Sequence, residues 1–334
     1  MNFDSTFVTH GIDVIDDPEL PQGEAVYIFA VNHVPNPEPP SNPPAEGYRR
    51  SLSRIEVFHH TFGTSEAQYI RTVMHPLIRT PNDVYAVSPL SLYVTNDHFY
   101  TDRGLMRTLE DVNHVANWTE VVHVQLDPAA AATANDVANP YNGVTAAIAL
   151  PKVHNPNGLG HGRTSSEILV SRAAAGTMYI GQMNVEDNTI KVVDTIEIDS
   201  VVDNPSYFSD PYVKETGVDR SGYVLPGIAK AVNLAHTSRD PKGVDPVMVW
   251  YVRRKDQDKA KGITDPSQGE WEKTLLFANN GKMIRSASAA VLVPIHPEDE
   301  DAREADGSKS DKRKAWLFVT GFVSHSIVAV MVDL

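Results

Sequence analysis

The sequence predicts an all-β protein, and three observations support this fold class. Short apolar runs rich in β-branched and aromatic residues recur along the chain, turn signals separate them, and helical spacing is rare. Such a pattern is typical of a sandwich, a barrel or a propeller. At 334 residues, four-stranded blades around a central channel fit better than one sandwich. We therefore expect a single β-propeller domain over residues 1–334, although no familiar propeller repeat is visible.

The first hundred residues contain most of the clear signals. His10-Gly-Ile-Asp13 predicts a turn, and the apolar run Ala25–Val31 predicts a buried strand that ends on Asn32 and His33. A proline-rich loop follows at 34–49, because proline fits neither a helix nor an inner strand. Alternating or apolar runs predict the next four strands at residues 54–59, 68–73, 84–87 and 91–95.

The rest of the chain continues the series with few interruptions. Leu105–Asn117 has helical spacing, and Ala129–Ala134 is a linker or a short helix. Residues 154–162, rich in Gly, Asn and His, predict a loop, and the charged segment 298–314 is expected to be disordered and solvated. Further strands are expected at residues 118–124, 144–150, 167–171, 177–183, 191–198, 222–225, 232–235, 247–253, 272–277, 288–294, 315–322 and 327–332.

Composition excludes several classes of function. The net charge of −14, from 43 acidic and 29 basic residues, makes nucleic acid an improbable partner. The chain has no cysteine, which excludes disulfides, thiolate zinc sites and a cysteine nucleophile. No run of about 18 apolar residues occurs, so no transmembrane helix is expected. The N-terminus lacks signal-peptide features; we expect a cytoplasmic protein as the chain stands, and a secreted one if an upstream segment exists.

Polar pairs stand where predicted strands begin or end. Asn82 and Asp83 precede one strand, and an amide beside a carboxylate offers the oxygen donors that calcium prefers. The alternative is a simple turn, since both residues are common turn formers. In a propeller the inner strands converge, so such pairs would build one oxygen-rich site with histidines beside it. The same kind of junction recurs at Asn32–His33, Asn96–Asp97–His98, Asn142–Gly143, Asp203–Asn204, His236 and Ser324–His325.

These segments resemble the paraoxonase/arylesterase family, which are six-bladed propellers that use calcium to hydrolyse lactones and aryl esters. The block from Asn82-Asp83 to Thr95-Asn-Asp-His98 is the most specific part of the resemblance. The segments that carry it follow the family's order at residues 10–12, 27–33, 54–58, 81–87, 95–99, 141–144, 202–204 and 321–325.

The resemblance implies two calcium ions and a histidine dyad. The dyad falls on His10 and His33, and His98 and His236 match further histidines in or around the family's site. The second, buried ion would be held by the Asp83 carboxylate and the Ile12 carbonyl. The catalytic ion would be held by Asn82, Asn142, Asp203 and Asn204.

The implied reaction is metal-activated attack of water on a small ester or lactone. His10 would take the proton from water, His33 would orient it or relay the proton, and Asp203 is a rival base. No Gly-x-Ser-x-Gly segment supports a serine-hydrolase route.

Two features of the family have no match in this chain. Its N-terminal Glu-Asp pair is absent, which implies that the first blade is missing, and so is its disulfide. Because the lost carboxylates would weaken calcium binding, the alternative function is a catalytically impaired propeller that serves as a scaffold or binding protein. The sequence leaves the oligomeric state open.

Overall fold

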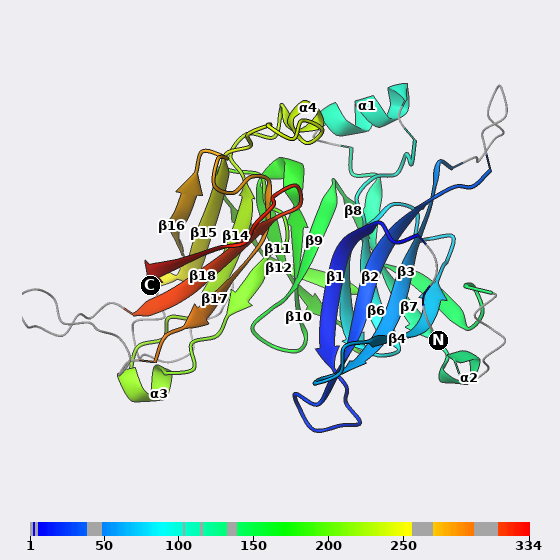
Figure 1. The fold of residues 1–334 in the computed structure, drawn as a ribbon, viewed down its shortest axis with the longest axis horizontal. Coiled ribbons are helices and arrows are strands. Elements are labelled where there is room, and N and C mark those ends of the chain that lie inside the picture. The colour runs from blue at the N-terminus through cyan, green and yellow to red at the C-terminus, as the bar shows by residue number, and fades with distance from the viewer. Residues whose placement is uncertain are drawn as a thin grey trace, which may run out of the picture. The chain divides into compact units, whose positions relative to one another are not determined.

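A computed structural model describes residues 3, 6–38, 49–102, 104–113, 116–131, 139–255, 270–296 and 313–334. Strands dominate it, and they form five sheets, four of four strands and one of three (Figure 1). In each sheet the strands follow one another in chain order, which is the pattern of propeller blades. The predicted all-β propeller class is thus confirmed, with five blades where the resemblance implied a six-bladed type. That the first blade is the one lacking stays a prediction.

The chain divides into two compact units, each described below by itself. Unit 1 comprises residues 1–159 and 183–191, and unit 2 comprises residues 160–182 and 192–334. The expectation of a single domain stays a prediction. Most of the proline-rich loop (39–48) and of the charged segment (up to 312) lies outside the described residues. No helix in the described ranges is both long and apolar enough to cross a membrane.

Unit 1 is built on two antiparallel sheets. The first contains β1 (Thr9–Asp16), β2 (Ala25–Pro35), β3 (Ser51–Thr61) and β4 (Ala67–Val73). The second contains β5 (Pro81–Ser88), β6 (Ser91–Asn96), β7 (Thr119–Leu126) and β8 (Val144–Val153). Two short helices, α1 (Leu105–Val112) and α2 (Pro128–Ala131), interrupt the second sheet's connections.

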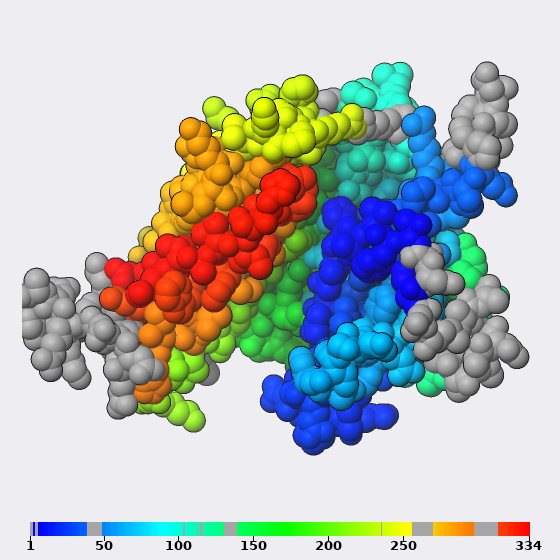
Figure 2. Space-filling model, in the orientation of Figure 1, coloured from blue at the N-terminus to red at the C-terminus, as the bar shows by residue number. Residues whose placement is uncertain are grey.

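The remaining strands form three further sheets. One contains β9 (Pro156–His161), β10 (Glu167–Arg172), β11 (Thr177–Met183) and β12 (Ile190–Glu197). The next contains β13 (Ser206–Phe208), β14 (Gly222–Ile228), β15 (Val247–Arg254) and β16 (Trp271–Asn279), with the helical turns α3 (Val213–Thr216) and α4 (Leu234–Thr237) between them. The last contains β17 (Ala287–Pro294), β18 (Lys314–Gly321) and β19 (Val328–Asp333). These last strands, orange to red, form part of the surface of unit 2 in Figure 2.

The core of unit 1 lies between its two sheets. Phe29 and Val57 of the first sheet pack in one cluster with Val94 and Val122 of the second, and all four are at most 2% exposed. Burying each such side chain contributes roughly 1.5–3 kcal/mol. This cluster fixes β1 and β2 against β5, the three strands that carry the candidate site.

A repeated hydrogen-bond network anchors the ends of β2 and β6. Asn32 Nδ2 donates to Glu56 Oε1 at 2.9 Å, and Asn96 Nδ2 donates to Glu120 Oε1 at 2.7 Å. The Asn32 amide oxygen also accepts the backbone N–H of Val8, just before β1. The Asn96 amide oxygen accepts the backbone N–H of Arg79, just before β5. Both asparagines are fully buried. His33 follows Asn32 and Asp97 follows Asn96. These networks therefore fix the positions of both candidate site residues.

Two glycine-bearing segments differ from their predictions. His10–Asp13 was predicted as a turn, and this is wrong, because it belongs to β1. A Cβ on Gly11 would come within 2.5 Å of Asp83 Cα, so this glycine serves close strand packing. The predicted loop at 154–162 is also wrong, since it contains β9. There a Cβ on Gly160 would lie 2.2 Å from the Pro205 carbonyl oxygen. In both places glycine permits a close backbone approach and does not mark a turn.

Other helices and strands also differ from their predicted ranges. The strand predicted at 232–235 is wrong, because residues 234–237 form the helical turn α4. The predicted helix from Leu105 ends at Val112 and does not reach Asn117. The short elements β13 and α3 carried too few residues for a periodic signal and were not predicted.

Candidate active site

Two histidines meet at the edge between β1 and β2. His10 Nδ1 lies 3.1 Å from His33 Nε2, and His33 Nδ1 lies 2.8 Å from Ser53 Oγ on β3. His33 and Ser53 are direct partners in the β2–β3 ladder. Strand register therefore builds this row of side chains, and the structure brings together the two histidines that the sequence paired.

Both histidines favour the neutral form. Burial, and after it the charge of His10, lower the pKa of His33 to about 4 against the opposing charge of Asp97. Burial also lowers the pKa of His10, again opposed by Asp97, although His10 as a whole residue is exposed. At neutral pH the pair can therefore accept a proton.

Asp97 supplies a negative charge beside this pair. Burial raises its pKa, but the contacts and charges of His98, Arg107 and His10 outweigh burial and hold the pKa below its ordinary value. His98 joins the cluster through Nδ1, 3.0 Å from Asp97 Oδ1, and through Nε2, 3.0 Å from Asp111 Oδ1 on α1. An ionised Asp97 would stabilise positive charge on His10 after proton uptake.

Asp83 is the centre of a second, buried cluster. Its carboxylate accepts backbone N–H groups from Val84 at 2.9 Å and from Leu159 at 2.8 Å. Gly11 of β1 packs directly on this carboxylate, since a Cβ there would lie 2.1 Å from Oδ1. The pKa of Asp83 is raised to about 7, chiefly by burial and to a lesser degree by the charge of Asp13, with its two backbone hydrogen bonds opposing the rise.

This cluster has the chemistry of a hard-cation site. Asp83 is 4% exposed and makes no ion pair with Lys or Arg in the part of the chain that the structure describes. Asn82 is 5% exposed, and no side-chain hydrogen bond to it is found among the described residues. A buried carboxylate without a counter-charge, next to a buried amide oxygen, suits a calcium ion. The described residues contain no group of three or more His, Cys, Asp or Glu that could hold a metal, so amide and carbonyl oxygens would have to complete the shell.

The structure brings Asn157, which sequence reasoning missed, to this cluster. Its carbonyl oxygen accepts a hydrogen bond from Thr95 Oγ1 at 2.6 Å, and Thr95 Oγ1 accepts the backbone N–H of Asp83 at 3.0 Å. Asn142, the residue predicted from the sequence, lies in the turn before β8, and its carbonyl oxygen accepts Arg71 Nη2 at 2.6 Å. Both residues precede a glycine. The same Asn-Gly dipeptide therefore occurs at both positions, but the composition of residues 154–162 predicts a loop and gives no reason to prefer Asn157.

Asp203 and Asn204 lie in unit 2 between β12 and β13. The Asp203 N–H donates to the Pro226 carbonyl at 3.0 Å, and the Asn204 N–H donates to the Ser288 carbonyl at 3.0 Å. Asn204 also forms an isolated parallel bridge with Ala289. The backbone of both residues is thus fixed against β14 and β17. Their part in binding an ion stays a prediction from the resemblance, as does any role of His236, an exposed residue on α4.

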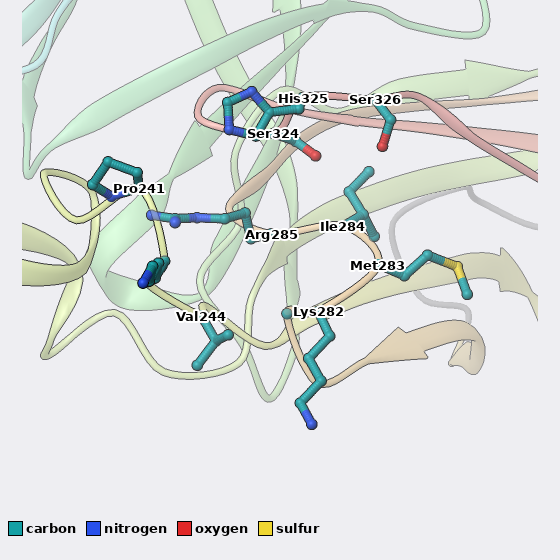
Figure 3. A pocket seen from close by; sticks show the side chains of 12 residues that line it. Pro241, Val244, Lys282, Met283, Ile284, Arg285, Ser324, His325 and Ser326 are labelled. Atoms are coloured by element: carbon teal, nitrogen blue, oxygen red, sulfur yellow. The ribbon is translucent and has the colours of Figure 1, made fainter.

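Unit 2 also contains an open pocket of about 420 Å³ (Figure 3). The predicted polar pair Ser324–His325 lines it, together with loop residues 241–244 and 281–285. Arg285 at its wall donates to the carbonyls of Thr237 and Asp240, and its Nε lies 3.3 Å from the Asp245 carboxylate. This carboxylate offsets its charge.

The fold and the polar clusters define a β-propeller with a buried oxygen cluster and a neutral histidine pair, and the comparison with known families is consistent with this class. A family model for arylesterases matches residues 5–214, more than half of the chain. The chain therefore belongs to the arylesterase family.

Individual relatives are similar at low identity. The chain is 24% identical over 286 residues to serum paraoxonase/arylesterase 2 of Bos taurus, which covers 86% of this chain and 64% of that protein. It is 23% identical over 285 residues to serum paraoxonase/lactonase 3 of Homo sapiens, covering 85% of this chain and 63% of that protein. The chain thus spans less than two thirds of the length of these relatives.

Similarity to solved structures is weaker. A putative oxidoreductase (glucose dehydrogenase) from Thermus thermophilus covers 100% of this chain and 85% of its own, with a TM-score of 0.39 and 14% identity. A luciferin-regenerating enzyme covers 99% of this chain and 96% of its own, with a TM-score of 0.37 and 12% identity. Scores at this level carry no argument about function.

Proposed function

We propose that the protein is a calcium-dependent hydrolase of small carboxylic esters, acting on lactones and aryl esters. One observation carries the proposal: a pair of histidines with lowered pKa values lies on β1 and β2, and Gly11, next to His10, packs on the buried Asp83 carboxylate of β5, which lacks a counter-charge. Membership of the arylesterase family and the names of the relatives support the same reaction class.

In this proposal His10 is the general base. Its Nδ1 faces His33, so Nε2 is the nitrogen that takes the proton from the attacking water. His33 orients the ring, and the charge of Asp97 stabilises the imidazolium that results. Asp203 remains the alternative base that the resemblance implies.

Two calcium ions are proposed. The resemblance implies Asn82, Asn142, Asp203 and Asn204 as ligands of the catalytic ion, with Asn157 as the rival to Asn142, and Asp83 with the Ile12 carbonyl would hold the structural ion. Bound calcium would polarise the substrate carbonyl and stabilise the negative charge that develops on its oxygen. Neutral amide ligands suit this role, because they leave more of the ion's charge unneutralised than carboxylates do.

The test is hydrolysis of phenyl acetate and of a six-membered lactone by the purified protein in excess calcium. His10→Gln should lower kcat at least about 100-fold, the usual contribution of a general base. His60→Gln is the matched control, since His60 is a half-buried β3 histidine whose Nδ1 is hydrogen-bonded to the Glu66 carbonyl. Equal turnover by both variants would exclude His10 as the base. A protein that hydrolyses neither substrate would fit the alternative of a binding scaffold.

A further inference from the structure

A row of polar groups extends the histidine pair away from the proposed reaction centre. Ser53 Oγ lies 2.8 Å from His33 Nδ1 and 3.4 Å from Ser51 Oγ. Ser51 Oγ in turn lies 3.3 Å from the Val34 carbonyl oxygen. All of these groups come from the facing ends of β2 and β3, where His33 pairs with Ser53 and Val34 pairs with Leu52. The row therefore runs from a backbone carbonyl to His10.

The carbonyl at the end of the row fixes the direction of every hydrogen bond in it. A carbonyl oxygen only accepts, so the Ser51 hydroxyl donates to Val34. The Ser51 oxygen can then only accept from the Ser53 hydroxyl, and Ser53 in turn accepts from the N–H of His33 Nδ1. If Ser53 instead donated to His33 while Ser51 donated to Val34, the two serine oxygens would face each other with no proton between them.

The same logic continues to His10. A neutral imidazole carries one proton, so a His33 protonated at Nδ1 has an unprotonated Nε2. That nitrogen must accept from His10 Nδ1 across the 3.1 Å contact. His10 then carries its proton on Nδ1, and its Nε2 holds a free lone pair.

We propose that Ser53 is a positioning residue that holds His33 in the Nδ1–H tautomer and so presents Nε2 of His10 as the proton acceptor. The consequence for turnover rests on the proposed function, whereas the tautomer of His33 does not. Without the Ser53 hydroxyl, no group in the row selects between the two tautomers of His33. A His10 protonated at Nε2 would be a donor and could not deprotonate water.

The chain offers a matched control for this contact. Ser91 Oγ lies 2.8 Å from Nε2 of the buried His123, on β6 and β7, which is the same kind of serine–histidine pair at the same distance. Ser53→Ala and Ser91→Ala therefore remove equivalent hydroxyl groups, one inside the row and one outside it. Ser53→Thr keeps the hydroxyl and serves as the rescue variant.

The experiment is ¹⁵N-resolved NMR of the histidine side chains of the full chain at pH 7.5 in excess calcium, together with ester turnover. We expect His33 of the unaltered protein to carry its proton on Nδ1, and Ser53→Ala to give a mixture of tautomers. Turnover by Ser53→Ala should fall about tenfold in kcat with KM unchanged within about twofold, while Ser53→Thr and Ser91→Ala stay close to the unaltered protein.

Several results would overturn the proposal. One is a His33 protonated at Nε2 in the unaltered protein; another is a Ser53→Ala protein whose tautomer and kcat are unchanged. A loss of kcat in Ser53→Ala that Ser53→Thr fails to restore would also contradict it. If the unaltered protein hydrolyses no ester or lactone, the proposed function fails, and the NMR result alone decides the role of Ser53.

Discussion

Gly11→Ala is the substitution that most directly tests how β1 and β5 build the candidate site. The new methyl carbon would lie 2.1 Å from Asp83 Oδ1, 2.5 Å from Asp83 Cα and 2.6 Å from the Asn82 carbonyl oxygen. Two of these neighbours are backbone atoms that no rotamer change can move. To reach a carbon–carbon separation of about 3.5 Å, β1 must shift away from β5 by about 1 Å.

We expect this shift to lower the free energy of unfolding by about 3 kcal/mol, the upper end of the range for overpacking. In a chain of 334 residues that corresponds to a fall in Tm of about 4 °C. Because Gly11 adjoins both His10 and Ile12, turnover and calcium-induced stabilisation should fall together. Urea unfolding, thermal melts with and without calcium, and phenyl acetate turnover measure these effects.

Gly104→Ala provides the control. Gly104 has extended backbone geometry with φ 174°, and a Cβ there meets nothing within 4 Å. We expect it to change stability by less than about 0.5 kcal/mol. If Gly11→Ala is as stable and as active as Gly104→Ala, β1 does not pack on Asp83 as described and the reasoning is refuted.

Two further predictions concern ligands and pH. Asn157→Ala should reduce the rise in Tm that calcium produces in calorimetric melts, whereas Asn142→Ala should not. If only Asn142→Ala reduces this rise, Asn142 and not Asn157 is the calcium ligand. The second follows from the pKa of His33, lowered to about 4. Because the unfolded chain binds this proton more tightly, the contribution of His33 to stability is fully present above about pH 6.5 and is lost as pH falls towards 4, by up to about 3 kcal/mol. In urea unfolding across that range, His33→Asn should therefore lose less stability than the unaltered protein; parallel pH profiles would contradict the lowered pKa.

The strand pattern could be predicted from the sequence wherever side chains carried it. The apolar run Ala25–Val31, the alternation at 54–59 and the strand predicted at 247–253 appear as β2, β3 and β15, since apolar runs and alternation both leave a clear signal. Glycine-rich strands could not be predicted in this way. In β9 and at Gly11 the strand exists because backbones approach closely, and no local propensity reports such a contact.

The candidate site was predictable in part for the same reason. His33 and the pair Asn82–Asp83 stand at strand ends that the pattern located, whereas the pattern predicts a turn at His10. The structure places His10 of β1 beside His33 of β2, and Gly11 of β1 against Asp83 of β5. The sequence predicts Asn142 and offers no signal for Asn157, because Asn157 reaches the Asp83 cluster only through β9, whose Leu159 N–H donates to Asp83 at 2.8 Å.

The central claim, that calcium held at this cluster supports ester hydrolysis, is tested most directly by one titration. Phenyl acetate turnover is followed while calcium is removed with a chelator and then added back to the same sample. The account predicts that turnover is lost on chelation and restored by calcium, and that Asp83→Asn needs far more calcium for the same recovery. Turnover that is unaffected by the chelator would contradict it.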